Sequence, residues 1–139
     1  MAADIELFAL ATRTTTTYTE TRGNVSLQPR EVEADVVGSA VDLADNRALN
    51  LALAWDNLGS DGANGIADVE VETSHDGVSW RDLAKFSARP VGDSTGSERI
   101  SCVADRYVRG RARIAFRSGN QAPGKVRFSV SGRAVGSAT

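Results

Sequence analysis

The residues that most often do chemistry in enzymes are scarce in this sequence. Its one histidine, His75, precedes Asp76 and Gly77 in a turn-forming stretch, whereas general acid–base catalysis usually needs a histidine held by a second group in a cleft. The one cysteine, Cys102, lies in a short apolar segment, where we expect a buried, inert thiol. No nucleophile motif and no glycine-rich phosphate loop is found. The sequence therefore predicts a protein that is not an enzyme and needs no cofactor.

Three aspartates near a glycine-rich loop are the strongest candidates for metal ligands. Asp56, Asp61 and Asp68 offer the oxygen atoms that calcium prefers. Their spacing fits neither an EF-hand nor a nonapeptide repeat, and one histidine and one cysteine far apart in the sequence give no zinc spacing. We therefore expect solvated loop carboxylates and predict no metal site.

Arginines at alternate positions form the most regular pattern that could bind a partner. Four of them share one face of a predicted strand: Arg109, Arg111, Arg113 and Arg117. An equally regular acidic series occupies another predicted strand: Asp68, Glu70 and Glu72. If the two strands are neighbours, cross-strand ion pairs neutralise the arginines, which is our expectation. Otherwise the arginines face an oppositely charged protein surface, so they stay candidate partner-binding residues, together with Arg13 and Tyr18.

Charge and hydropathy argue against two classes of partner. A net charge of −2 and aromatic residues that do not interleave with the basic ones disfavour nucleic acid. No apolar run approaches the length of a membrane-spanning helix. The first ten residues carry Asp4 and Glu6, where a secretion signal would have a basic and then an apolar segment. We expect no contact with nucleic acid or membrane.

Apolar residues recur at every second position through much of the chain. The clearest run covers residues 48–55, and others cover 67–74, 107–117 and 125–131. Turn-forming segments separate these runs, and Asp76-Gly77 is a hairpin signal. Such a pattern predicts an all-β fold, an antiparallel sandwich or barrel. The aromatic residues expected in its core are Trp55, Trp80, Phe86, Phe116 and Phe128.

The first 35 residues follow a different pattern. Residues 5–10 could form a strand, and the threonine-rich stretch at 12–19 is polar on both faces, which is typical of an edge strand or of an arm that pairs with another molecule. Residues 31–35 are charged, and we expect them to be irregular. The predicted division is an N-terminal edge strand or arm (1–35), with the edge strand favoured, a β-sandwich (36–135) and a C-terminal tail (136–139).

Three segments, in this order, resemble a known class of protein. Residues 69–86 contain Ser-x-Asp-Gly-x-x-Trp ending at Trp80, residues 106–109 read Arg-Tyr-Val-Arg, and residues 126–134 form an alternating strand that ends in Gly-Arg-Ala. Together they resemble small jelly-roll accessory proteins of tailed-phage particles, and head decoration proteins are the nearest type. The first two segments are also similar to discoidin-like sandwiches. The resemblance covers residues 67–135, about half of the chain.

The resemblance implies both a fold and a role. The fold is an antiparallel jelly-roll-like β-sandwich. The role is that of a virion structural protein, a decoration protein that binds the major capsid protein or another virion protein, is assembled in the host cytoplasm, and forms a homo-oligomer, for example a trimer. A tail, neck or baseplate component is an alternative. The discoidin-like similarity implies a second alternative role, that of a carbohydrate-binding adhesion module, which would need an exposed tryptophan. No catalytic residue carries over.

Overall fold

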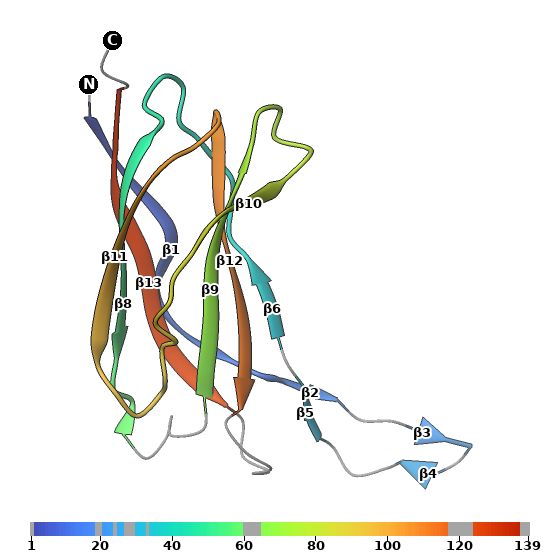
Figure 1. Ribbon diagram of the computed structural model, residues 1–139. Coiled ribbons are helices and arrows are strands. Elements are labelled where there is room, and N and C mark those ends of the chain that lie inside the picture. The colour runs from blue at the N-terminus through green and yellow to red at the C-terminus, as the bar shows by residue number, and fades with distance from the viewer. Residues whose placement is uncertain are drawn as a thin grey trace.

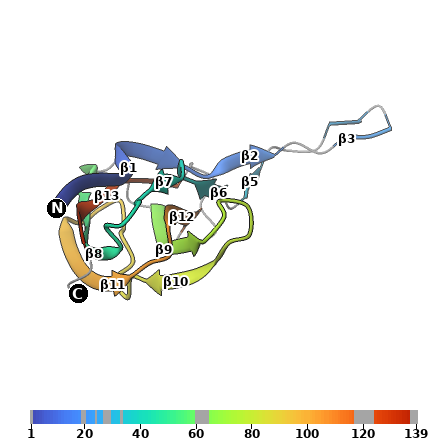
Figure 2. The ribbon, with the colours of Figure 1, turned by 90° about the horizontal axis from the view of Figure 1, so that it is seen from above.

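The computed structural model describes residues 2–18, 21–23, 25–26, 30–32, 34–59, 65–116 and 124–136. Within these ranges the regular elements are β-strands, and most of them form two antiparallel sheets that face each other (Figures 1 and 2). Across the same ranges there is no helix of the length and apolarity that crossing a membrane requires. The prediction of an all-β, antiparallel, sandwich-like fold is confirmed.

Each sheet combines strands that are far apart in the sequence. The four-stranded sheet has the order β1 (Ala2–Thr14), β13 (Lys125–Val135), β8 (Ala48–Asp56) and β11 (Gly96–Val103). The five-stranded sheet has the order β10 (Arg81–Lys85), β9 (Gly65–Ser74), β12 (Tyr107–Phe116) and β6 (Ala34–Val37), and β7 (Val41–Asp42) also pairs with β12. All the strands that the two-residue alternation predicts are therefore present.

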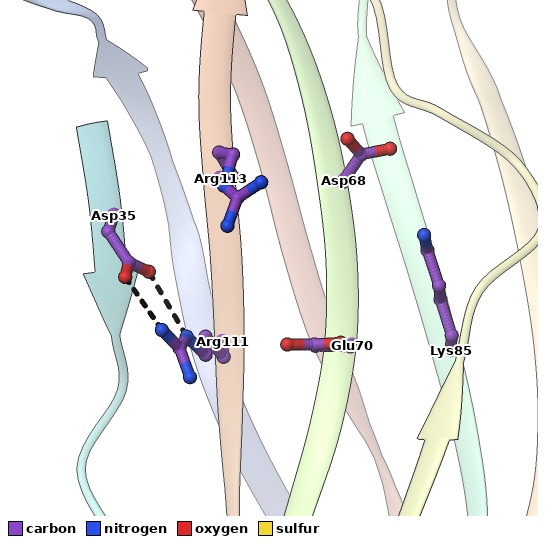
Figure 3. A pocket seen from close by; sticks show the side chains of 6 residues that line it. All are labelled: Asp35, Asp68, Glu70, Lys85, Arg111 and Arg113. Carbon is purple, nitrogen blue, oxygen red and sulfur yellow. Dashed lines mark hydrogen bonds and ion pairs between the residues drawn. The ribbon is translucent and has the colours of Figure 1, made fainter. Parts of the chain in front are cut away.

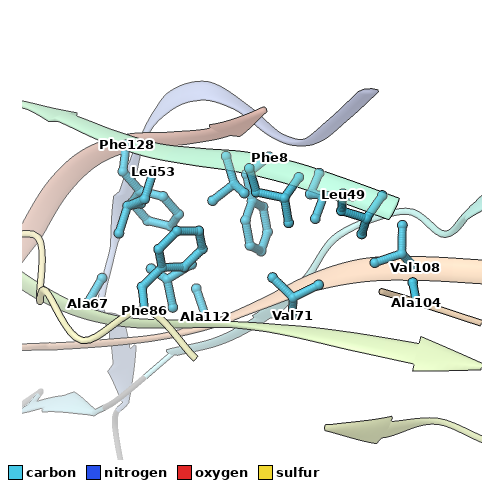
Figure 4. Packing of buried hydrophobic residues seen from close by; sticks show 14 of the residues in the cluster. Phe8, Leu49, Leu53, Ala67, Val71, Phe86, Ala104, Val108, Ala112 and Phe128 are labelled. Atoms are coloured by element: carbon cyan, nitrogen blue, oxygen red, sulfur yellow. The ribbon is translucent and has the colours of Figure 1, made fainter. Parts of the chain in front are cut away.

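The apolar side chains of the two sheets meet in one core (Figure 4). On β8 the alternate residues Leu49, Leu51 and Leu53 are at most 1% exposed, because successive side chains of a strand point to opposite faces. Phe8 and Phe128 make an edge-to-face contact with their ring centroids 5.5 Å apart. Burial of this surface is the main force that holds the sheets together.

The five predicted core aromatics divide into four groups. Phe86 and Phe128 are fully buried, as predicted. Trp55 is half-buried at the margin of the core, and its indole N–H donates to the Ser94 hydroxyl at 3.1 Å. Trp80 lies outside the core cluster, so the prediction that it is a core residue is wrong. Trp80 directly precedes β10, and its ring lies against the Arg109 guanidinium. The side chain of Phe116 is outside the described residues.

The N-terminal region contains both an edge strand and an arm. β1 is the edge of the four-stranded sheet, and its pairing with β13 shifts register on either side of Phe8. Beyond it, β2 (Thr16–Tyr18) pairs with β5 (Arg30–Val32), and β3 (Thr21–Arg22) pairs with β4 (Val25–Ser26). We call these four strands the ribbon. Figures 1 and 2 both show it projecting away from the two sheets.

The expectation that residues 31–35 are irregular is wrong. They belong largely to β5 and β6, and β6 pairs with β12. The signal was present in the sequence, because Val32, Ala34 and Val36 alternate with acidic residues. A charged outer face on an edge strand has the same two-residue period as a buried strand.

The predicted hairpin at Asp76-Gly77 is confirmed. It joins the antiparallel strands β9 and β10. Gly77 has φ +79°, a conformation that side chains with a Cβ rarely adopt. One Asp76 carboxylate oxygen accepts from the backbone N–H groups of Val78 (2.8 Å) and Ser79 (2.9 Å), and from the Ser74 hydroxyl (2.9 Å). These bonds lower the pKa of Asp76 to about 2.

Candidate functional site: the charged face of the five-stranded sheet

The predicted arginine stripe lies on the outer face of the five-stranded sheet, beside the acidic stripe. β12 and β9 are adjacent, and their register places Arg109 opposite Glu72, Arg111 opposite Glu70 and Arg113 opposite Asp68. The interpretation that the two stripes pair within the sheet is therefore the one that the geometry supports. Arg117, the fourth arginine of the predicted stripe, lies outside the described residues.

Glu72 is the centre of this network. Its side chain is 6% exposed, and its carboxylate lies 2.8 Å from Nε of Arg109 and 3.5 Å from Nη1 of Arg111. A carboxylate this deeply buried needs such partners, because desolvation of an unpaired charge is costly. Arg109 also covers the Trp80 ring, with 4.1 Å from its Cζ to the ring centroid. The two arginines are thus engaged by this sheet.

A small hollow of about 120 Å³ lies on the same face (Figure 3). Three acids and three bases line it: Asp35, Asp68, Glu70, Lys85, Arg111 and Arg113. Arg111 donates two parallel hydrogen bonds to Asp35 on β6, from Nε (3.2 Å) and from Nη2 (2.8 Å). These bonds lower the pKa of Asp35 and raise that of Arg111. The charges in the hollow balance one another, so it offers no strongly anionic or cationic pocket.

Further ion pairs extend the network around the hairpins. Arg89 pairs with Asp68 at 2.7 Å, Arg106 with Asp42 at 2.9 Å, and Arg81 with Asp105 at 3.1 Å. The bond from Arg106 lowers the pKa of Asp42. Exposed pairs such as these stabilise a fold only slightly. Their effect here is to leave this face nearly neutral despite its density of charge.

The acidic groups on this face also bear on metal binding. Carboxylate oxygens of Glu70, Glu72 and Asp82 lie within 4.8 Å of one another. Both oxygens of Glu72 are within 3.5 Å of arginine nitrogens. The carboxylate of Glu72 is therefore better placed to pair with the two arginines than to bind a metal ion. Of the aspartates weighed as calcium ligands, Asp68 pairs with Arg89, Asp56 lies 3.7 Å from Arg127, and Asp61 is outside the described residues.

Arg13, predicted as a partner-binding residue, makes its contacts within the chain. Its guanidinium donates to the backbone carbonyls of Ala9 (2.9 Å), Ala11 (3.1 Å) and Phe128 (3.0 Å). Its Cζ also lies 4.9 Å from the ring centroid of Phe8 and 4.6 Å from that of Phe128. Burial lowers its pKa. Arg13 therefore holds the irregular part of β1 against β13, which no spacing rule in the sequence indicated.

The other candidate residues have simpler surroundings. Tyr18 belongs to β2, and its side chain is outside the described residues. The His75 side chain is 79% exposed in the hairpin and lies 3.9 Å from Asp76. Cys102 is half-buried on β11, and burial raises the pKa of its thiol. His75 is thus exposed in the predicted turn, whereas Cys102 is half-buried and not fully buried as expected.

No protein-family model matches the chain, and no curated protein sequence matches it.

Proposed function

We propose that this chain is a non-enzymatic structural protein of a virus particle, a decoration protein that binds and stabilises a phage-type capsid lattice. Its partner is the major capsid protein or another protein of the particle, and it joins the particle in the host cytoplasm. The observation that carries the proposal is the ribbon, which extends β1 and β6 beyond the sandwich (Figure 1).

The order of the strands supports the jelly-roll fold that this role implies. If β6 and β7 count as one strand and the ribbon is set aside, the sandwich has eight strands. The first pairs with the eighth (β1–β13), the second with the seventh (β6 and β7 with β12), the third with the sixth (β8–β11), and the fourth with the fifth (β9–β10). A long hairpin rolled into two sheets gives this order, and viral capsid and lectin domains both use it.

The ribbon supports attachment to a partner because of its own marginal stability. A two-stranded hairpin without a sheet or helix against it is at best marginally stable in water. Its open edges gain hydrogen bonds when a strand of another protein pairs with them. Many copies on one lattice add avidity to a weak single contact. The pairing of the arginines with acidic residues on the charged face supports a protein partner rather than nucleic acid.

A shortened ribbon tests the proposal. Thr16 and Val32 lie opposite each other at the base of the ribbon, so residues 17–31 can be replaced by Asn-Gly, which makes a two-residue hairpin turn. We expect the full chain to co-sediment with shells assembled from the major capsid protein of the same genome. The shortened chain should remain in the supernatant, while a Lys85→Ala control, changed on the charged face, should pellet like the full chain. Equal pelleting of the shortened chain would remove the ribbon from the mechanism.

Sedimentation with shells, followed by electron microscopy of whole particles, distinguishes a location on the head from one on the tail, neck or baseplate. If the full chain fails to pellet with shells but is found by electron microscopy on tails, necks or baseplates, the decoration role is replaced by a tail or neck role.

The half-buried Trp80 supports a second candidate, a discoidin-like carbohydrate-binding module. Trp80 is outside the core and lies in the hairpin region, where an aromatic ring is able to stack on a sugar. Arg109 already occupies one side of this ring. A glycan array tests this candidate: binding that is lost in Trp80→Ala and kept in Trp55→Phe supports it, and no signal from the full chain excludes it.

A further inference from the structure

The outer face of the four-stranded sheet differs from the charged face in its pattern. Strand pairing places outward residues in rows across β1, β13, β8 and β11. One row reads Glu6, Ser131, Ala52 and Arg99, and the next reads Asp4, Arg133, Asn50 and Ser101. The first row therefore has an acidic residue on β1, a basic residue on β11 and small uncharged side chains between them, and in the second row the acidic Asp4 lies beside Arg133 of β13. In Figure 2 it points away from the other sheet.

Two charged side chains at opposite ends of one row have no partner among the described residues. The side chains of Glu6 and Arg99 are exposed, and neither side chain makes a hydrogen bond or ion pair with any residue that the structure describes. They are separated by three strand spacings, about 14 Å, too far to pair with each other. Arg133 and Asp4, in the next row, are 3.7 Å apart and largely exposed. Among the described residues of this face, the ion pairs are Arg133–Asp4 and Arg127–Asp56, each at 3.7 Å, which is longer than the pairs of the charged face.

Between Glu6 and Arg99, the middle of the row consists of the small uncharged residues Ser131 and Ala52. A hollow of about 520 Å³ opens on it, lined in part by Ala52, Ser131 and Gly132 and flanked by Arg99 and Arg133. Val103, at the end of β11, is 69% exposed, although it is apolar. Small side chains let a second sheet approach closely, as the facing sheets of a sandwich do.

We propose that a second copy of this chain packs on this face, about a two-fold axis that runs parallel to the strands between β13 and β8. That axis lays β1 of each copy over β11 of the other. Glu6 of each copy then lies over Arg99 of the other copy, and Ser131 lies over Ala52, so the face is complementary to itself, as an isologous interface requires. An axis across the strands would instead stack β1 on β1 and bring the acidic side chains of Asp4 and Glu6 together. The charge pattern therefore selects the first arrangement.

The size of the face indicates a weak dimer. Four strands are about 19 Å wide, and the eight residues of β11 are about 27 Å long. The two copies together would bury about 1,000 Å², which is at the lower limit for a specific interface. Two exposed ion pairs contribute at low salt and are screened at high salt. We therefore expect a dimer whose dissociation constant is in the micromolar range and rises with ionic strength.

Sedimentation velocity of the full chain over a concentration series tests the dimer, and charge reversal tests its geometry. Glu6→Arg and Arg99→Glu, made singly, each place like charges over one another and should weaken the dimer about tenfold or more. The double variant restores opposite charges and should recover the dimer. Asp82→Arg makes the same kind of change on the other sheet's outer face and should leave the dimer unchanged.

The outcomes are decisive in either direction. A full chain that stays monomeric at every concentration, or that forms the trimer suggested by the resemblance, overturns the inference, as do single reversals with no effect or a double variant that fails to recover. If a reversed variant loses its β-sheet circular dichroism, a salt series on the unmodified chain decides: a dimer insensitive to added salt overturns the inference. The inference does not depend on the virion role, because it concerns the purified chain alone.

Discussion

Replacement of Arg13 by alanine should destabilise the fold far more than its position on an edge strand suggests. The side chain makes three hydrogen bonds to backbone carbonyls and lies on two phenylalanine rings. Two of the carbonyls belong to the irregular stretch of β1 between Phe8 and Ala11, where the regular ladder with β13 is interrupted. Without the guanidinium, Ala9 and Ala11 lose these hydrogen bonds, and the edge of the ring pair is opened to water.

The expected loss follows from these contacts. At a half-buried site each hydrogen bond from the guanidinium contributes about 0.5 kcal/mol, the lower end of the usual range. Each ring contact adds about 0.5 kcal/mol. The free energy of unfolding should therefore fall by about 2–3 kcal/mol in Arg13→Ala. Arg13→Lys keeps the charge but loses the planar fork, so it should recover less than half of the loss.

Urea unfolding followed by tryptophan fluorescence measures this loss, with the dependence on urea expected to stay unchanged. Arg81→Ala is the matched control, because Arg81 makes a single exposed ion pair with Asp105. Its removal should cost about 0.5 kcal/mol. If Arg13→Ala costs no more than Arg81→Ala, the reasoning about β1 is refuted.

Three further predictions follow from single groups. The pKa of Asp76 is lowered from 3.8 to about 2 in the folded chain, so its carboxylate stabilises the fold above about pH 4, and this stabilisation is lost as the pH falls toward 2; the difference in melting temperature from Asp76→Asn should shrink over that range. Burial raises the pKa of the Cys102 thiol, so a thiol reagent should label the native chain about tenfold more slowly than the chain unfolded in urea. A methyl group at position 110 would lie 2.6 Å from the Phe8 ring, so Gly110→Ala should cost about 1–3 kcal/mol in urea unfolding.

Each of these predictions has a contradicting result. A melting difference that is constant from neutral pH to pH 2 would show that the Asp76 bonds do not favour the ionised form. Equal labelling rates in native and unfolded chains would mean that Cys102 is not protected. For Gly110→Ala, the double variant with Phe8→Leu should cost less than the two single losses combined, and strict additivity would exclude the contact.

Strands with a long apolar series on their inward face were predictable, whereas short strands and a strand interrupted by a polar residue were not. The inward positions of β8, β9, β12 and β13 are mostly apolar, with Thr73 on β9 as a buried polar exception. β11 was missed because one of its alternate, less exposed positions holds Glu98, whose carboxylate accepts hydrogen bonds from the Ser87 hydroxyl and the backbone N–H of Ser87 and Ala88. A polar residue whose hydrogen bonds are supplied by a loop interrupts the apolar alternation in the sequence, although the strand itself continues.

The charged face was predictable only where two regular strands meet. The arginines of β12 occupy alternate positions and therefore share one face of the strand, and the acidic residues of β9 also occupy alternate positions. The Asp35 partner of Arg111 was not predicted, because residues 31–35 were interpreted as irregular. Arg13 was assigned to a partner and Trp80 to the core for a shared reason: the contacts of both depend on bulges, turns and distant strands, which leave no period in the sequence.

The root of the ribbon has a mechanical consequence. One of its strands continues β1, in the four-stranded sheet, and the other leads into β6, in the five-stranded sheet. A pull on the tip is therefore divided between both layers, and along β1 it acts parallel to the strand, so that the hydrogen bonds to β13 resist it together rather than one after another. A tether built in this way yields by sliding a whole strand, which requires more force than peeling one end.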